Sequence, residues 1–467
     1  MKNIFVLLLS CILFVGSGSI ALATNGYQLI GVGQTQKSMA GAVTAAPMDS
    51  MTAITNPAGM ARIGKRANFS MEAFMPVRSV DFSVNGGGST EGGSELYGIP
   101  SIGWTAPAFN RDNMFFGGGM YGTSGLGVDY DQTVFMPGAA LDQSFGAPSG
   151  TFSNVTFSGY SAIQFWKMAP TVAINFNDKL SAGFALNMDY QSITISQKIR
   201  NVPFWNDPSN PLAGVTQMDV NFDLGRPTNQ MGFGATIGVI YDIIDQVSVG
   251  ASYSSEQFFS EGEFRVGDND ILNFNGAVGK AGTYEMDLNY PQQLALGVAL
   301  KPIPPLLIAL DFKWIGWSGT HDEVTFTGPS NAFDSNGDGV GDSDETTLDF
   351  GWDDQYVYAI GIQYTVNDAL RVRTGYNFSE APIDEADVFN NLVFPAVVEQ
   401  HFTLGVDYMM GDHWGIGMTY MKAFKETVEG SGDVPAGFQQ TTPFTADSGT
   451  EITLEEDSVG IELTYLF

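Results

Sequence analysis

A twelve-residue acidic segment, residues 334–345, has the ligand spacing of a calcium-binding loop. Oxygen donors stand at its positions 1, 3, 5, 7, 9 and 12, and Gly339 stands at position 6, where such loops turn sharply. A solvated acidic loop without bound metal is the alternative, because flanking helices are not evident. The segment is the one place where the sequence predicts an ion, Ca²⁺, and no other cofactor is expected. The predicted ligands are Asp334, Asn336, Asp338, Val340 through its carbonyl, Asp342 through water, and Glu345.

Catalytic chemistry has little support in the sequence. The chain has three histidines, His321, His401 and His413. No Gly-x-Ser-x-Gly motif and no zinc-ligand spacing accompanies them, although triads on a barrel wall leave no sequence spacing to search for. We therefore expect a protein that is not an enzyme.

The charge balance excludes one class of partner. The chain of 467 residues carries 51 acidic and 20 basic residues, for a net charge of −31. A surface this negative repels the phosphates of nucleic acid, so no nucleic acid partner is expected. An acidic surface of this kind suits loops that bind cations.

The first 23 residues have the three parts of a secretory signal peptide. A short positive start precedes the apolar stretch 4–14, and a small-x-small site ends at Ala23. A membrane anchor, or a lipoprotein signal cut near Cys11, are the alternatives. Cys11 is the only cysteine, so cleavage after Ala23 leaves a chain without disulfides.

The segments that must position any site are strands. In the last ten residues, 458–467, apolar and small or polar residues alternate, and the pattern recurs along the chain. No mature stretch supplies the roughly 20 apolar residues of a membrane helix. Short turns alternate with long loops, and aromatic residues gather at strand ends, as in outer-membrane barrels. A soluble all-β protein is the alternative.

We therefore predict an all-β fold, a transmembrane antiparallel β-barrel of about 14 strands over residues 67–467. Signal peptide and barrel together predict export to a Gram-negative outer membrane. The stretches 128–162, 197–230 and 318–353 are predicted to be long surface loops. Residues 24–66 do not alternate and are rich in small residues, so they are predicted to form a plug (hatch) inside the lumen, with a periplasmic tail as the alternative.

Several motifs in order carry a resemblance to a known family. They are the tripeptide Asn56-Pro57-Ala58, the segments 231–241 and 249–254, the pentapeptide 288–292, the dipeptide Trp317-Ser318, and the segment 373–382. The tripeptide alone is an ordinary turn, whereas the ordered set covers nearly the whole mature chain. With this set the chain resembles the FadL/TodX family of outer-membrane transporters of long-chain fatty acids and other hydrophobic compounds.

The resemblance implies a mechanism as well as a fold. It implies passive import of hydrophobic molecules, with long-chain fatty acids as the expected substrates. These are captured in an outer groove, move to a lumen site and leave sideways through a kinked third strand after the hatch rearranges. The alternatives are an uptake channel for aromatic hydrocarbons and a general porin for polar solutes. The expected surroundings are outer-membrane lipid and lipopolysaccharide, and the expected state is a monomer. Asn56, Pro57 and Ala58 match the hatch motif.

The resemblance also directs attention to three sets of residues. The kink is predicted at the glycines that crowd the third strand, although these glycines could instead only leave room for the plug. Inward-facing cations could pair with a substrate carboxylate, or else with inward-facing acids. Aromatic residues could line the outer groove, or else only pack their loop against itself. The three sets are the glycines Gly117, Gly118, Gly119 and Gly122, the cations Lys167, Lys313, Arg371 and Arg373, and the groove residues Phe135, Met136, Phe145 and Phe157.

Overall fold

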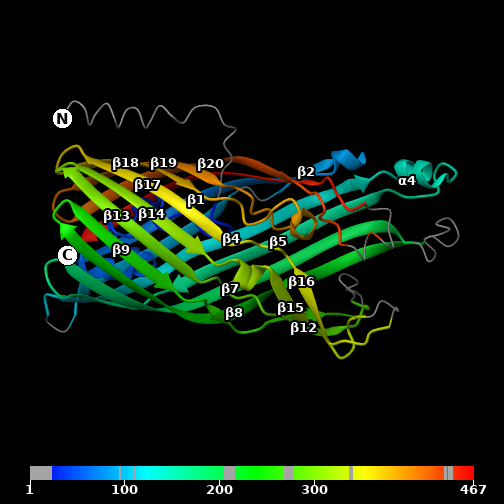
Figure 1. Cartoon of the computed structure of the whole chain (residues 1–467), viewed down its shortest axis with the longest axis horizontal. Coiled ribbons are helices and arrows are strands. Elements are labelled where there is room, and N and C mark those ends of the chain that lie inside the picture. Colours follow the sequence, from blue (N-terminus) through cyan, green and yellow to red (C-terminus); the bar gives the residue numbers. More distant parts are fainter. Residues whose placement is uncertain are drawn as a thin grey trace.

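The alternating segments pair in chain order and close into a barrel (Figure 1). The computed structural model describes residues 24–93, 96–108, 111–204, 216–267, 277–335, 340–435, 439 and 445–467. The strands of the wall are β1 (Arg66–Asp81), β3 (Tyr97–Pro107), β4 (Met114–Met136), β5 (Val155–Met168), β6 (Thr171–Asn175), β7 (Leu180–Phe204), β8 (Thr216–Ile244), β9 (Val247–Ser254), β13 (Gln293–Ile303), β14 (Leu306–Ile315), β17 (Gln355–Thr365), β18 (Leu370–Phe378), β19 (Gln400–Met410), β20 (Trp414–Glu429) and β21 (Glu451–Leu466).

The predicted closed barrel of fourteen antiparallel strands is confirmed. The main sheet contains seventeen strand segments, of which the short β2 (Ser89–Glu91) and β10 (Phe258–Phe259) pair only at its margin. β5 and β6 both pair with β4 and β7 and are two halves of one strand, which leaves fourteen strands around the wall. β1 closes the ring by pairing with β21 over its full length. No helix in the described parts of the chain is long and apolar enough to cross a membrane.

The terminal strand shows the alternation that the sequence predicts. Val459 and Ile461 of β21 are 40% and 46% exposed, whereas Gly460 and Glu462 between them are buried and face the lumen. An apolar outer face and a small or polar inner face are what a membrane barrel requires.

Two predicted loops consist mostly of strand and helix, so those predictions were wrong. Most of the stretch 128–162 belongs to β4, β5 and the intervening helix α4 (Gly138–Phe145). The stretch 197–230 is occupied by the ends of β7 and β8, except for residues 205–215, which lie outside the described residues.

The alternation of apolar and polar residues was misread there because the apolar residues change from the outer face to the inner face along a strand such as β7. In β7, Phe184 and Leu186 face outward, as lipid contact requires, but further along Ile193, Ile195 and Ile199 are buried on the inner face. A spanning strand needs only about 9–11 residues, and β7 has 25. Where a strand extends beyond the membrane, its apolar side chains face the interior of the barrel, because the outer face is in contact with water.

The stretch 318–353 was also predicted to be a loop, and it is partly folded. It contains α5 (Ser318–His321), β15 (Glu323–Thr327) and β16 (Glu345–Asp349). With β11 (Gly262–Val266) and β12 (Gly282–Met286) these strands form a small four-stranded sheet at the end of the barrel that carries the long loops (Figure 1). Two short 3₁₀ turns, η2 (Ser83–Asn85) and η3 (Val388–Asn391), lie in other loops.

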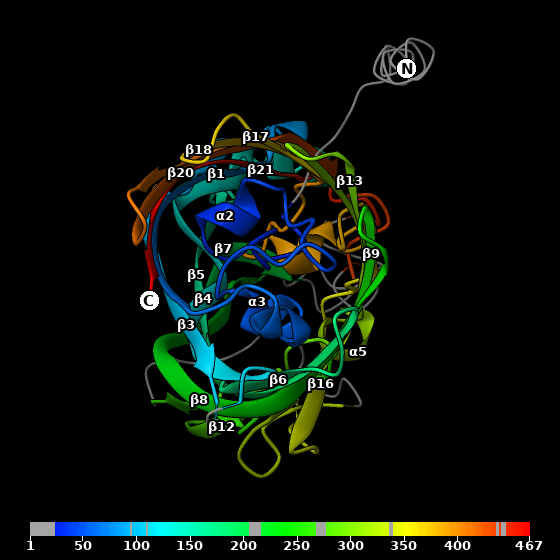
Figure 2. The ribbon, with the colours of Figure 1, turned by 90° about the vertical axis from the view of Figure 1, so that its left-hand side faces the viewer.

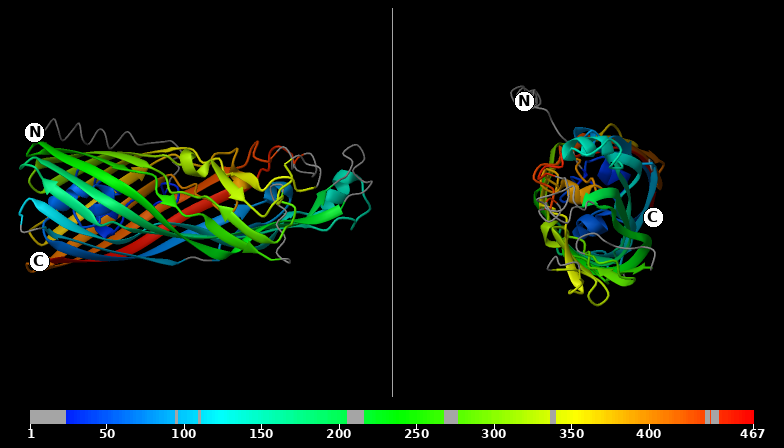
Figure 3. Two further views of the ribbon diagram at one scale, coloured as in Figure 1. Left: turned by 90° about the horizontal axis from the view of Figure 1, so that it is seen from below. Right: turned by 90° about the vertical axis from the view of Figure 1, so that its right-hand side faces the viewer.

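Residues 24–65, here called the N-terminal segment, lie inside the ring of strands (Figure 2). The segment contains α2 (Gln34–Lys37), α3 (Thr52–Thr55) and η1 (Pro57–Ala61). It occupies the half of the barrel that carries the short turns (Figure 3). Lys37 forms a fully buried ion pair with Glu72 of β1, and Glu462 of β21 accepts a hydrogen bond of 2.9 Å from the backbone N–H of Gln34.

Candidate functional site: a cavity at a break in the barrel wall

Within the described residues, the pairing of β3 with β4 stops partway up the wall. The two strands pair from Pro107↔Phe115 to Ser101↔Tyr121. β3 continues beside β1 as far as Tyr97, and β4 continues beside β5. The wall is joined again further up, where the backbone N–H of Gly93 donates to Asp129 O at 2.8 Å. The result is a break between β3 and β4, bounded at both ends.

The backbone below the break is distorted. Gly118 has φ +135°, and a Cβ there would lie 2.3 Å from the carbonyl oxygen of Ala169. Ala169 and Pro170 separate β5 from β6, so the neighbouring strand is interrupted at the same level. Only glycine tolerates both this φ and this approach.

The predicted kink glycines lie at this level. Gly117, Gly118 and Gly119 are in the last paired stretch below the break, and Gly122 is the first residue of β4 beyond it. The register of β4 against β5 also shifts between Gly122 and Ser124. That these glycines permit release of a substrate stays a prediction.

The N-terminal segment covers part of the break. The backbone N–H of Leu29 donates to Thr123 O at 3.0 Å, and the N–H of Gly125 donates to Tyr27 O at 3.1 Å. Residues 27–29 therefore add a short antiparallel strand to the edge of β4 that β3 leaves unpaired.

Tyr27 also connects this short strand to the long-loop end. Its hydroxyl lies 2.9 Å from Nε2 of His321 in α5, and its ring lies 4.9 Å from that of Trp317 and 5.8 Å from that of Trp352. Burial without a facing charge lowers the pKa of His321 to about 3, so this imidazole is neutral and holds its hydrogen bond at neutral pH.

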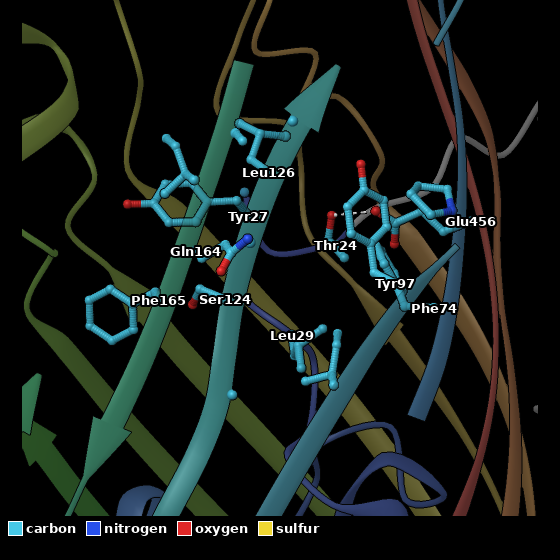
Figure 4. Close-up of a pocket in the computed structure, with 18 of the residues that line it drawn as sticks. Thr24, Tyr27, Leu29, Phe74, Tyr97, Ser124, Leu126, Gln164, Phe165 and Glu456 are labelled. Atoms are coloured by element: carbon cyan, nitrogen blue, oxygen red, sulfur yellow. Dashed lines mark hydrogen bonds between the residues drawn. The ribbon is translucent and has the colours of Figure 1, made fainter. Parts of the chain in front are cut away.

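A cavity of about 190 Å³ lies at the break (Figure 4). Its walls are mostly apolar. Thr24, Arg78 and Glu456 lie at one polar end, and Ser124 and Gln164 line the cavity elsewhere. A cavity of roughly 150 Å³ with apolar walls holds a benzene molecule in a protein core, so this cavity is of the size of one aromatic ring. The apolar lining includes Leu29, Phe74, Ile99, Leu126, Ile163, Trp166 and Leu454.

The predicted hatch motif, Asn56-Pro57-Ala58, holds the N-terminal segment to β7 and β8. Asn56 Oδ1 accepts from the backbone N–H of Ala58 at 3.2 Å, and its Nδ2 donates to Val239 O of β8 at 3.2 Å. A Cβ at Gly183 of β7 would lie 2.3 Å from the backbone of Pro57, so the motif contacts the wall directly.

The four predicted lumen cations lie away from this cavity, in two pairs. Arg373 is bound to Asp407 at 2.5 Å and, with Arg371, lines a polar cavity of about 310 Å³ toward the short turns. Lys167 lies 3.7 Å from Asp189 and shares a narrow cavity of about 70 Å³ with Lys313.

Sequence reasoning missed Arg78, the cation that does line the cavity at the break. Arg78 is on the predicted strand 67–84 and has the same parity as Glu72, so strand alternation would have placed it inside the barrel.

The predicted groove residues gather at the long-loop end and pack against other aromatic rings. The rings of Phe135 and Phe157 lie 4.5 Å and 5.3 Å from that of Phe82. Phe145 contacts Phe152 at 5.4 Å, and Met136 packs against the same apolar cluster. All four residues belong to or pack against one large apolar cluster, and their role as a capture groove stays a prediction.

The predicted calcium loop is only partly covered. Asn336 and Asp338 lie outside the described residues, and the described ones contain no cluster of three acidic, histidine or cysteine ligands. Asp342 accepts from the backbone N–H of Ser335 at 2.8 Å, and Glu345 begins β16. Asp334 and Val340 lie in the same loop, and calcium binding here stays a prediction.

Known structures share this architecture. The toluene transporter TodX of P. putida matches with a TM-score of 0.66 and 17% identity, over 94% of this chain and 99% of that one. A Pseudomonas aeruginosa FadL homologue matches with a TM-score of 0.67 and 15% identity, over 96% and 100%. The Ralstonia pickettii toluene transporter TbuX matches with a TM-score of 0.63 and 17% identity, over 94% and 99%.

Identities this low support the fold and nothing more specific, and a search of curated proteins finds no match. The sequence itself matches a family model described as outer membrane protein transport protein (OMPP1/FadL/TodX) over residues 17–455. The chain therefore belongs to the OMPP1/FadL/TodX family of outer-membrane transport proteins.

Proposed function

We propose that this protein imports small hydrophobic molecules across the outer membrane and releases them sideways through the break between β3 and β4. The observation that carries the proposal is the apolar cavity at that break. Once the break is open, a hydrophobic molecule in this cavity would reach the lipid without entering the polar cavity that Arg371 and Arg373 line below.

The cavity also bears on the substrate class. Its volume of about 190 Å³ fits one aromatic ring, whereas a long acyl chain would extend beyond it. The cations expected to hold a fatty-acid carboxylate line other cavities. Toluene transporters and a monoaromatic hydrocarbon channel are among the structural neighbours. These points favour aromatic hydrocarbons over long-chain fatty acids as the substrate, and the apolar lining argues against a porin for polar solutes.

In this proposal the N-terminal segment is the hatch. Residues 27–29 cover the break through two backbone hydrogen bonds to β4, and Tyr27 is in contact with the long-loop end through His321. A molecule that arrives from the long-loop end displaces residues 27–29, and the break opens to the lipid.

Uptake of radiolabelled toluene by cells that express this protein in their outer membrane tests the proposal. Gly98 lines the cavity, and a Cβ added there meets nothing within 4 Å. Gly98→Trp should therefore fold normally and obstruct the break, lowering the uptake rate at least severalfold. Gly319→Trp is the matched control, since a Cβ there also meets open space but lies in α5.

Equal uptake by Gly98→Trp and Gly319→Trp would refute release through the break. Labelled oleate is run beside toluene. Transport of oleate that toluene does not compete with would return the substrate class to long-chain fatty acids.

A further inference from the structure

The polar end of the cavity contains a carboxylate with one oxygen unused. Glu456 projects inward from β21 and is 3% exposed. Its Oε1 accepts a hydrogen bond of 3.3 Å from the hydroxyl of Thr24 (Figure 4). Its Oε2 has no hydrogen-bond partner among the described residues, although it is buried. A buried acceptor without a partner is costly, so an arriving ligand that supplies a donor gains binding energy there.

The other polar groups at this end are engaged with the protein. The guanidinium of Arg78 donates to the hydroxyl of Tyr97 at 3.2 Å and to the carbonyl oxygen of Gly127, and it lies 5.6 Å from the centre of the Tyr97 ring. Thr24 is the donor to Glu456 itself. Among the described atoms of this end, the buried acceptor that lacks a hydrogen bond is therefore Oε2 of Glu456.

We propose that this cavity selects neutral molecules with a body of about one ring and a single hydroxyl donor, such as phenols, and that Glu456 Oε2 accepts the hydrogen bond from that hydroxyl. The inference rests on the proposed import function and narrows its substrate class. A site that hydrogen-bonds a ligand hydroxyl discriminates against the analogue without it, because the buried group is then left unpaired.

The cavity also discriminates against acids. A ligand carboxylate would lose its hydration among mostly apolar walls, and burying a charge costs far more free energy than burying a hydroxyl. The ring of the ligand would lie among Phe74, Ile99 and Leu126, which give no polar contact.

Three ligands of nearly equal shape test the inference, namely toluene, p-cresol and p-toluate. Each is radiolabelled, and its binding to the detergent-purified full chain is measured by equilibrium dialysis against detergent alone. A hydrogen bond to a buried acceptor that otherwise stays unpaired predicts that p-cresol binds about tenfold more tightly than toluene. p-Toluate should bind more weakly than toluene.

Two variants of Glu456 connect the preference to this residue. Glu456→Leu should reduce the ratio of p-cresol to toluene affinity to about one, while toluene binding, which needs no acceptor, persists and reports an intact cavity. Glu456→Gln, which keeps the shape, should reduce the ratio partly. Glu455→Gln is the matched control, because Glu455 is the next residue of β21, pairs with Lys422 and does not line the cavity.

The outcomes separate the two proposals. Equal affinity of wild-type protein for p-cresol and toluene, or a preference that survives in Glu456→Leu, overturns the inference and leaves hydrocarbon import standing. Tightest binding of p-toluate overturns it in favour of acid ligands. Absence of binding by all three ligands overturns both the inference and the function on which it rests.

Discussion

The buried ion pair between Lys37 and Glu72 should control how firmly the N-terminal segment is held in the barrel. Lys37 is 0% exposed and Glu72 is 3% exposed, so neither charge can be solvated when its partner is removed. Removing one partner of a buried pair costs about 3–5 kcal/mol. Lys37→Met should therefore increase the population of the undocked segment by roughly 100-fold to 4,000-fold, at 1.4 kcal/mol per factor of ten.

Cysteine labelling measures that population. Cys11 is the only cysteine in the sequence and lies in the predicted leader, so Ala42→Cys, at a fully buried position of the segment, supplies a single reporter thiol. Its rate of reaction with a maleimide follows the population of the undocked state when redocking is fast. The reporter is common to all variants, so its own effect on packing cancels in the comparison.

Two controls decide whether the unpaired charge is the cause. The double variant Lys37→Met, Glu72→Leu removes both charges and should label nearly as slowly as the parent, since a buried pair replaced by apolar residues is often neutral. Lys422→Met breaks a partly exposed pair with Glu455 and Asp457 and should change the rate by less than about fivefold. Labelling of Lys37→Met at the parent rate, or of the double variant as fast as the single one, would refute this reasoning.

Two further predictions concern the backbone below the break and the contact of Tyr27. Gly118→Ala should lower the temperature at which the folded barrel loses its fast mobility on a gel. A side chain at φ +135° costs about 1–3 kcal/mol of folding free energy, and the clash of its Cβ with Ala169 adds to this cost. Gly125→Ala is the control, because Gly125 has no positive φ and its substitution should have a much smaller effect. Burial lowers the pKa of His321 to about 3, so the stability this neutral imidazole contributes is fully present above its unfolded pKa of about 6.5 and is lost as the pH falls toward 3. The tryptophan fluorescence of the α5 region should therefore change on acidification below pH 6.5 in the wild type, and His321→Gln should remove that part of the change. Identical curves for the two proteins would contradict the assignment.

The membrane-spanning part of the fold could be predicted from the sequence because lipid imposes one simple rule. Outward positions such as Val459 and Ile461 must be apolar, and the period of two then gives strands, their number and the short turns. The same rule failed above the membrane, where Ile193 and Ile195 take the inner face and the expected pattern is reversed.

The cavity at the break was harder to predict because it exists only where β3 and β4 are not paired. Gly117 to Gly122 indicated unusual backbone in the third strand, but no residue type indicates that β3 and β4 separate beyond Tyr121 or that residues 27–29 fill part of the space. The cations were chosen by parity alone, which placed Lys167 and Arg373 inside the barrel but could not say which cavity each one lines.

The length of β7 has a consequence for how a substrate first meets the protein. Twenty-five residues at ~3.3 Å each, tilted by ~40°, rise ~60 Å along the barrel axis, whereas the apolar band of an outer-membrane barrel is ~25 Å tall. The open end of the barrel therefore extends tens of ångströms beyond the lipid. A scarce, poorly soluble molecule that diffuses in water can reach that end without first crossing the hydrated layer at the membrane surface, so the height of the strands shortens its search.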